Sequence, residues 1–82
     1  MKTEFKTVTK LPPLEEMQKF VGGYVERLRL KNGHTLYVNE DGRLNGLPTN
    51  KIATALWNAN WNTGYKIVGN VIYHCMVNKE GE

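Results

Sequence analysis

The side chains of this sequence with the most potential for catalysis or metal binding are His34, His74 and Cys75. His74 and Cys75 are adjacent in a stretch that we expect to form a strand, so their side chains point to opposite faces and cannot readily bind one ion. A structural zinc site needs four ligands at characteristic spacings, and the sequence contains no such set. Catalysis by Cys75 would need a base that a third group orients, and His74 points away. The sequence therefore predicts no metal, no cofactor and no enzymatic activity.

The other patterns that can indicate catalysis have structural explanations. Glu15 and Glu16 fall in the first turn of a predicted helix, where the helix dipole favours negative charge. Glu40 and Asp41 have the composition of a turn. The pair Gly22-Gly23 follows a predicted helix instead of leading into one, so it does not form a phosphate-binding loop.

Residues 22–46 form a predicted β-hairpin around which the chain is organised. A two-residue Asn32-Gly33 turn would pair Leu28 with Tyr37, whereas a three-residue Lys31-Asn32-Gly33 turn pairs Leu28 with Leu36. Directly opposed residues share one face of a sheet. We predict the three-residue turn, because it alone gathers the aliphatic residues of the hairpin on one face. These residues are Leu28, Leu30, Leu36 and Val38.

The opposite face of the hairpin carries basic and aromatic residues that suggest binding. Arg27, Arg29 and Tyr37 share this face with Thr35, and Lys31 lies at the tip. Such a face can stack bases and contact phosphates, but the same composition is typical of any solvated sheet. The sequence also lacks the aromatic motif of RNA-recognition modules. A solvated surface is therefore preferred, and a nucleic-acid-binding module that uses this basic face is the alternative prediction.

Trp57 and Trp61 lie one turn apart in the second predicted helix. We expect Trp57 in the core, because a small domain uses its large aromatic side chains to fill it. Trp61 fits the core and an exposed position equally well, and tryptophan is enriched at protein interfaces. The candidate interaction surface consists of Arg27, Arg29, Lys31, Tyr37 and Trp61.

Apolar periodicity and the positions of glycine and proline predict the remaining elements. The first half of the chain is predicted to contain a strand over 4–10, a helix over 14–21 that ends at Gly22-Gly23, and hairpin strands over 24–30 and 34–39. The second half is predicted to contain a helix that is capped by Thr49 or Asn50 and ends at Gly64, and a strand over 65–77 that is interrupted at Gly69-Asn70. This β-α-β-β-α-β order predicts an α+β fold with two helices packed on one face of an antiparallel sheet. The ferredoxin-like arrangement is one of the topologies that share this order.

Length and composition limit the class of protein. Eighty-two residues accommodate one domain, which we place at residues 3–77, followed by a flexible C-terminal tail at 78–82. The formal charge of +3 permits contact with nucleic acid without requiring it. The single cysteine fits a reducing compartment, and no apolar run approaches the length of a membrane span. We therefore expect a cytoplasmic monomer or homodimer that does not engage a membrane.

Several short motifs occur in an order that is typical of one family. They are Val21-Gly22-Gly23-Tyr24, the Val-Asn-Glu-Asp-Gly turn at 38–42, Gly46 with Asn50 and Ala53, and Ile67-Val68-Gly69. From Leu14 to Tyr73 the chain resembles a family of small uncharacterised domains of phages, plasmids and bacteria, defined only as a domain of unknown function. The segment after Ala53 departs from the family pattern, because it is richer in Trp and Asn. Asn70 also stands where many members have proline.

The resemblance implies a phage or mobile-element context and supplies no catalytic residues. Combined with the lack of a catalytic constellation in the sequence, it leads us to expect a non-enzymatic accessory protein. We expect this protein to act by binding a host or viral protein in the host cytoplasm.

Overall fold

The computed structural model describes residues 3–75 of the chain. Its elements are β1 (Phe5–Val8), α1 (Leu14–Val21), β2 (Val25–Arg29), β3 (Thr35–Asn39), α2 (Lys51–Trp61) and β4 (Val71–His74). The two helices and the four-stranded sheet confirm the predicted α+β class. The predicted tail at 78–82, and residues 76 and 77 of the predicted domain and last strand, lie outside the described residues.

The turn between β2 and β3 is the predicted three-residue turn. Leu28 pairs with Leu36, and the Leu30 N–H donates to the His34 carbonyl over 2.9 Å. Gly33 has a φ of 90°, the left-handed conformation that closes this type of hairpin. The Asn32 side chain accepts a hydrogen bond from the His34 N–H at 2.9 Å, which reinforces the turn. The predicted register is therefore confirmed.

The sheet is mixed, with the strand order β1-β4-β3-β2. β4 is antiparallel to β3, but β1 lies at the sheet edge and runs parallel to β4, with Phe5 opposite Val71. The prediction of an antiparallel sheet is therefore wrong, and the ferredoxin-like topology, which is antiparallel throughout, is not observed. No short turn connects β1 to β4, because nearly the whole chain separates them, and local sequence therefore does not determine the direction of their pairing.

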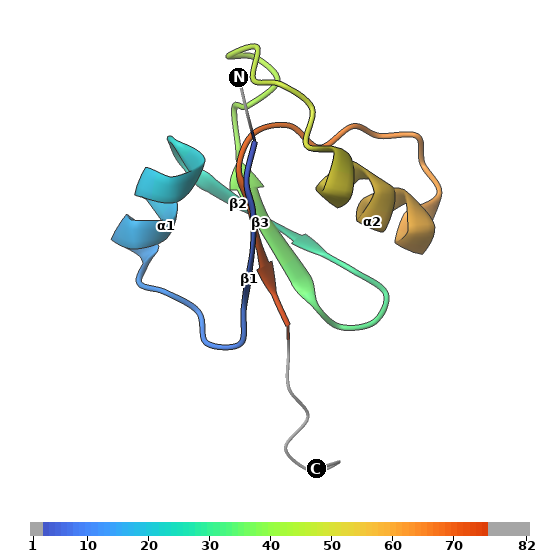
Figure 1. Cartoon of the computed structure of the whole chain (residues 1–82), viewed down its shortest axis with the longest axis horizontal. Coiled ribbons are helices and arrows are strands. Elements are labelled where there is room, and N and C mark those ends of the chain that lie inside the picture. The colour runs from blue at the N-terminus through green and yellow to red at the C-terminus, as the bar shows by residue number, and fades with distance from the viewer. Residues whose placement is uncertain (1–2, 76–82) are drawn as a thin grey trace, which may run out of the picture.

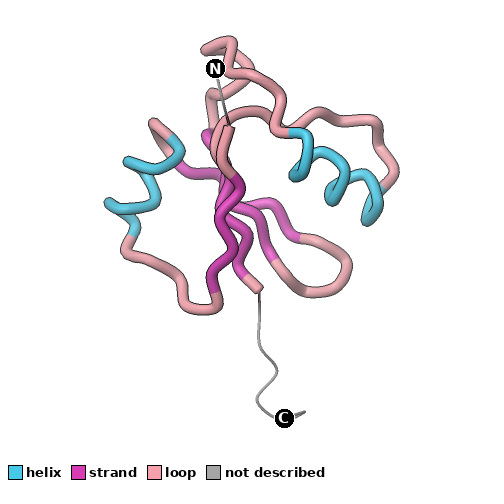
Figure 2. The backbone as a smooth tube through the Cα atoms, in the orientation of Figure 1, coloured by secondary structure: helices cyan, strands magenta, loops and turns pink. Residues whose placement is uncertain are grey.

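The two helices lie on opposite faces of the sheet, so the prediction that both pack on one face is also wrong (Figures 1 and 2). On the α2 side, Leu36 and Val38 of β3 pack with Ala53 in one core cluster. On the α1 side, Tyr37 and Met17 belong to a second cluster. The sheet is thus the middle of three layers, and its apolar surface is divided between two thin cores.

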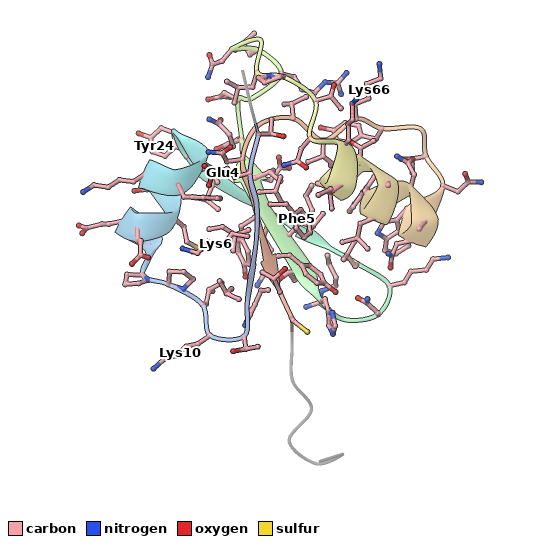
Figure 3. The ribbon with its side chains drawn as sticks, viewed as in Figure 1. Glu4, Phe5, Lys6, Lys10, Tyr24 and Lys66 are labelled. Atoms are coloured by element: carbon pink, nitrogen blue, oxygen red, sulfur yellow. The ribbon has the colours of Figure 1, made fainter. Side chains whose placement is uncertain are left out.

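The residues of β1 show the same division. Phe5 packs against the core on the α2 side, whereas the Lys6 ammonium lies 5.6 Å from the centre of the Phe20 ring on α1. Figure 3 shows these two side chains on opposite sides of the strand.

Every residue of β3 is buried, because β3 is an interior strand with a helix on each side. On the α2 side its buried residues are Leu36 and Val38, whereas on the α1 side the ring of Tyr37 lies between the buried polar residues Thr35 and Asn39.

Left-handed residues and one capping side chain set the ends of the helices. α1 ends at Gly22, which has a φ of 85°, as the glycine pair predicts. Asn50 caps α2, in agreement with one of the two predicted capping residues. α2 ends at Asn62, with a φ of 52°, before the predicted Gly64. Asparagine tolerates this conformation better than most residues.

The segment from the end of α2 to β4 is irregular over most of its length. β4 covers only Val71–His74, so the strand predicted from residue 65 begins later than expected, at residue 71. Thr49 and Val68 form an isolated bridge before it, and Gly69 has a φ of 80°. Figure 1 shows this segment passing over one end of the sheet. The predicted interruption at Gly69-Asn70 is therefore where the extended chain enters the sheet.

Three asparagine side chains connect the loops at this end of the sheet. Asn50 Nδ2 donates to the carbonyls of Glu4 and Gly69, at 3.1 and 2.9 Å, and its Oδ1 accepts the Ala53 N–H at 3.1 Å. Asn70 and Asn39 make corresponding contacts to the end of α1, because their side-chain amides donate to the carbonyls of Phe20 and Val21, each at 3.0 Å. Both helices are thereby joined to the sheet through buried or half-buried amides.

We predict that Asn50→Ala lowers the free energy of unfolding by about 3 kcal/mol, because it removes the cap of α2, leaves the buried Gly69 carbonyl unpaired and takes one of two hydrogen bonds from the Glu4 carbonyl. Asn50 is 2% exposed. Urea denaturation measures the change, and Asn45→Ala in the exposed loop before α2 is the matched control. Equal unfolding midpoints for the two variants would contradict this role of Asn50.

Candidate functional site

The predicted interaction surface is divided by the sheet. Arg27 and Arg29 are exposed on β2, on the face that α1 partly covers. Lys31 and Trp61 lie on the α2 side, where the hairpin tip meets the end of α2. The structure therefore brings together two pairs of the five predicted residues, one pair on each side of β2.

Tyr37 does not belong to an exposed surface. It is opposite Arg27 in the sheet, as predicted, but only 8% of it is exposed, because Met17 of α1 packs on it. The expectation that Tyr37 is exposed is wrong because it assumed that both helices pack on the other face. The basic face consequently lacks the aromatic ring that would stack on a base.

Trp61 lies against the hairpin between β2 and β3. It is 41% exposed, and its indole N–H donates to the Arg29 carbonyl at 2.9 Å. The neighbouring Asn60 side chain accepts the Lys31 N–H at 3.0 Å. Together these bonds fix the tip of the hairpin to the last turn of α2, which keeps the Trp61 ring against the edge of the sheet.

A groove of about 700 Å³ lies beside β2 on the α2 side. Its residues come from β2, from α2, from the segment that follows α2 and from the loop between β3 and α2. Figure 3 shows Lys66 on the segment that follows α2. We call this feature the β2 groove, and its main lining residues are Glu26, Leu28, Arg43, Trp57, Tyr65 and Lys66.

Three aromatic rings form a row that runs from the β2 groove toward the hairpin tip. The centre of the Trp57 ring lies 6.5 Å from that of Tyr65 and 6.2 Å from that of Trp61. A cation lies over each end of the row, with the Arg43 guanidinium 4.9 Å from the centre of Tyr65 and the Lys31 ammonium 5.3 Å from that of Trp61. The row thus presents apolar ring surface between two positive charges.

The backbone of β2 is open on its outer side, because β2 is the last strand of the sheet order. The Leu30 N–H donates to the carbonyl of His34, just before β3, and the Tyr24 carbonyl accepts from the N–H of Glu40, just after β3, at 2.8 Å. The even-numbered residues of this strand therefore bond to β3, and the odd-numbered residues point their N–H and C=O groups away from the sheet.

The outward groups belong to Val25, Arg27 and Arg29. The Arg29 carbonyl accepts a hydrogen bond from the Trp61 indole N–H. Within residues 3–75, no other hydrogen bond engages these outward groups. An exposed edge of this kind is a site where another extended chain can pair.

Basic side chains predominate around this edge. Arg43 and Lys66 line the β2 groove, and Glu26 and Glu40 are its acidic neighbours. Lys31 lies at the turn on the same side as the groove, and the exposed Arg27 and Arg29 project from the opposite face of β2. Counted over both faces of β2, these residues are five cations and two carboxylates, so the edge attracts negatively charged groups.

Sequence reasoning missed most of the β2 groove. Arg43, Tyr65 and Lys66 carried no signal, because they belong to loops that only the fold brings together. Trp57 was predicted in the core, and it packs against the core cluster while also lining the groove. The spacing of Trp57 and Trp61 was the one signal in the sequence that pointed to this region.

The residues considered for metal binding or catalysis lie apart from the β2 groove. The His34 ring bonds to the Tyr73 hydroxyl, and the His74 ring lies 3.3 Å from the Thr9 carbonyl. Cys75 is half-buried. Among residues 3–75, the structure brings together no group of three His, Cys, Asp or Glu side chains that could hold a metal ion.

Neither helix in this part of the chain combines the length and the apolar character needed to cross a membrane.

Comparison with protein families identifies the domain. The chain belongs to the family described as Domain of unknown function (DUF3846). The family model matches residues 2–82, and it confirms the resemblance to a small domain-of-unknown-function family. No curated protein and no solved structure matches the chain. The function of this member of DUF3846 must therefore be argued from its own surface.

We predict that Tyr37→Ala lowers the free energy of unfolding by about 3 kcal/mol, because it empties a site between α1 and the sheet. Tyr24→Ala is the control, since Tyr24 is 71% exposed, and it should change stability by less than about 0.5 kcal/mol. Thermal and urea unfolding of the two variants provide the measurement. Similar small losses for both would place Tyr37 at the surface and contradict the position of α1.

Proposed function

We propose that this protein is a non-enzymatic accessory protein of a phage or mobile element that binds a host or viral protein in the host cytoplasm. One observation carries the proposal: the open backbone edge of β2 lies directly beside the β2 groove. Unpaired backbone groups, aromatic rings and charges are the features with which a protein binds another polypeptide.

The shape and chemistry of the β2 groove support binding in preference to catalysis. Its rings and cations offer contact area and charge, and its one lining carboxylate, Glu26, has no histidine, cysteine or serine beside it among the lining residues. Histidine is the side chain that most often acts as general acid or base, and cysteine and serine are common nucleophiles. The proposed activity is therefore recognition of a partner.

Nucleic-acid binding is the alternative, and the exposed pair Arg27 and Arg29 favours it. With Tyr37 buried, this mode would depend on phosphate contacts, which weaken steeply as salt rises. A titration with single- and double-stranded DNA and RNA at low salt tests it. Absence of binding there would eliminate the alternative.

For the proposed function, we predict that a photoreactive amino acid at position 66 cross-links the protein to one specific partner in host cells. Lys66 lines the β2 groove, whereas Lys19 is exposed on α1 on the other side of the sheet. The same reagent at position 19 is therefore the matched control. Mass spectrometry identifies the products. Identical products from both positions, or no protein product from position 66, would contradict protein binding through the groove.

A further inference from the structure

We propose that the outer edge of β2 binds an extended acidic segment of a partner protein as an additional strand of the sheet. The central three residues of that segment are acidic, aliphatic and acidic. This inference rests on the proposed protein-binding function, and it specifies the chemistry of the partner. It follows from three features of β2: its backbone, its arginine pair and the β2 groove beside it.

The backbone provides the pairing groups. The N–H and C=O of Arg27 point away from β3, and the Arg29 carbonyl is taken by the Trp61 indole at 2.9 Å. An added strand can therefore exchange hydrogen bonds with Arg27 and Val25, but it finds only the N–H of Arg29 free. The Trp61 contact limits how far such a strand extends toward the hairpin tip.

The arginine side chains select acidic residues at two positions. Arg27 and Arg29 are two residues apart on one strand, so both side chains lie on the same face. Residues of an added strand that are directly opposite them share that face and have Cβ atoms about 5 Å away. Carboxylates at these two positions would pair with the guanidinium groups.

The β2 groove selects the residue between them. Leu28 lies between the two arginines in sequence and faces the opposite side of the sheet, where it lines the groove together with Trp57 and Tyr65. The residue of an added strand opposite Leu28 would project into this apolar surface. An aliphatic side chain fits there, because it adds buried apolar area against Leu28 and the rings.

The charges of β2 oppose pairing with a second copy of itself. In a symmetric antiparallel pair centred on Arg27, the two copies of Arg27 would be directly opposite each other. A pair centred on Leu28 would put Arg27 of each copy opposite Arg29 of the other. Like charges in these positions are destabilising, so the same arginines that attract an acidic strand disfavour a dimer through this edge.

The test is an NMR titration of the ¹⁵N-labelled full chain with the peptide acetyl-Ser-Thr-Glu-Val-Glu-Thr-Ser-amide at low salt. We expect the outward amides of Val25, Arg27 and Arg29 to shift and to become protected from hydrogen exchange. The outward amides of the other edge strand, Phe5 and Thr7 of β1, should be unaffected. A peptide with lysine in place of both glutamates should bind at least about tenfold more weakly.

Two further controls separate strand pairing from simple charge attraction. N-methylation of the three central residues of the peptide keeps its charges but blocks its backbone donors, and we expect it to abolish binding. The variant Arg27→Glu/Arg29→Glu should reverse the preference between the acidic and the lysine peptide. The control Lys19→Glu/Lys51→Glu has the same change in charge on exposed positions of the helices and should keep the preference.

Several results would overturn the inference. These are equal binding of the acidic and lysine peptides, undiminished binding of the N-methylated peptide, a response confined to β1, or a stronger response to single-stranded oligonucleotide. Concentration-dependent protection of the β2 amides without peptide would assign the edge to a second copy of the chain.

If cross-linking at position 66 finds a partner but the peptide leaves β2 unchanged, strand addition fails and the proposed function stands. If cross-linking fails, the proposed function itself fails.

Discussion

The three-residue turn at Lys31, Asn32 and Gly33 is the constraint on which the rest of the structure depends. It fixes the pairing of β2 with β3, with Leu28 opposite Leu36. Because side chains alternate along a strand, this pairing decides which of them enter each of the two cores. It decides equally which backbone groups of β2 bond to β3 and which point outward. A shift by one residue would move the leucines to the α1 side and would turn different N–H groups to the edge.

Helices cover both faces of the sheet, and β2 remains at its edge, where its outer side is open for binding. β3 and β4 are interior strands, and helices on either side bury them. Side chains of Asn39, Asn50 and Asn70 hold the loops and helix ends in place at one end of the sheet. The loop before α2 and the segment after it then place Arg43 and Tyr65 beside β2. The β2 groove thus lies between β2, α2 and two loops.

The parts of the structure that sequence reasoning predicted are those with local causes. Gly33 and Gly22 adopt the left-handed conformations that their positions require, and Asn50 caps its helix. The face that α1 covers could not be predicted, because Tyr37 serves equally well on a wet surface and in a thin core. The direction of β1 and the position of the β2 groove could not be predicted either, because both depend on contacts between segments that are distant in the sequence. Phe5 pairs with Val71 in the first case, and Arg43 contacts Tyr65 in the second.

The central claim is that β2 has one side bonded to β3 and an open outer side, and native-state hydrogen exchange of the free protein tests it most directly. The account predicts alternation along the strand: the amides of Glu26, Leu28 and Leu30 exchange slowly, and those of Val25 and Arg27 exchange quickly. Slow exchange at Val25 and Arg27 as well would mean that the outer edge is already covered. Slow exchange at Val25 and Arg27 with fast exchange at Glu26 and Leu28 would mean that the register is shifted. Either result would contradict the account.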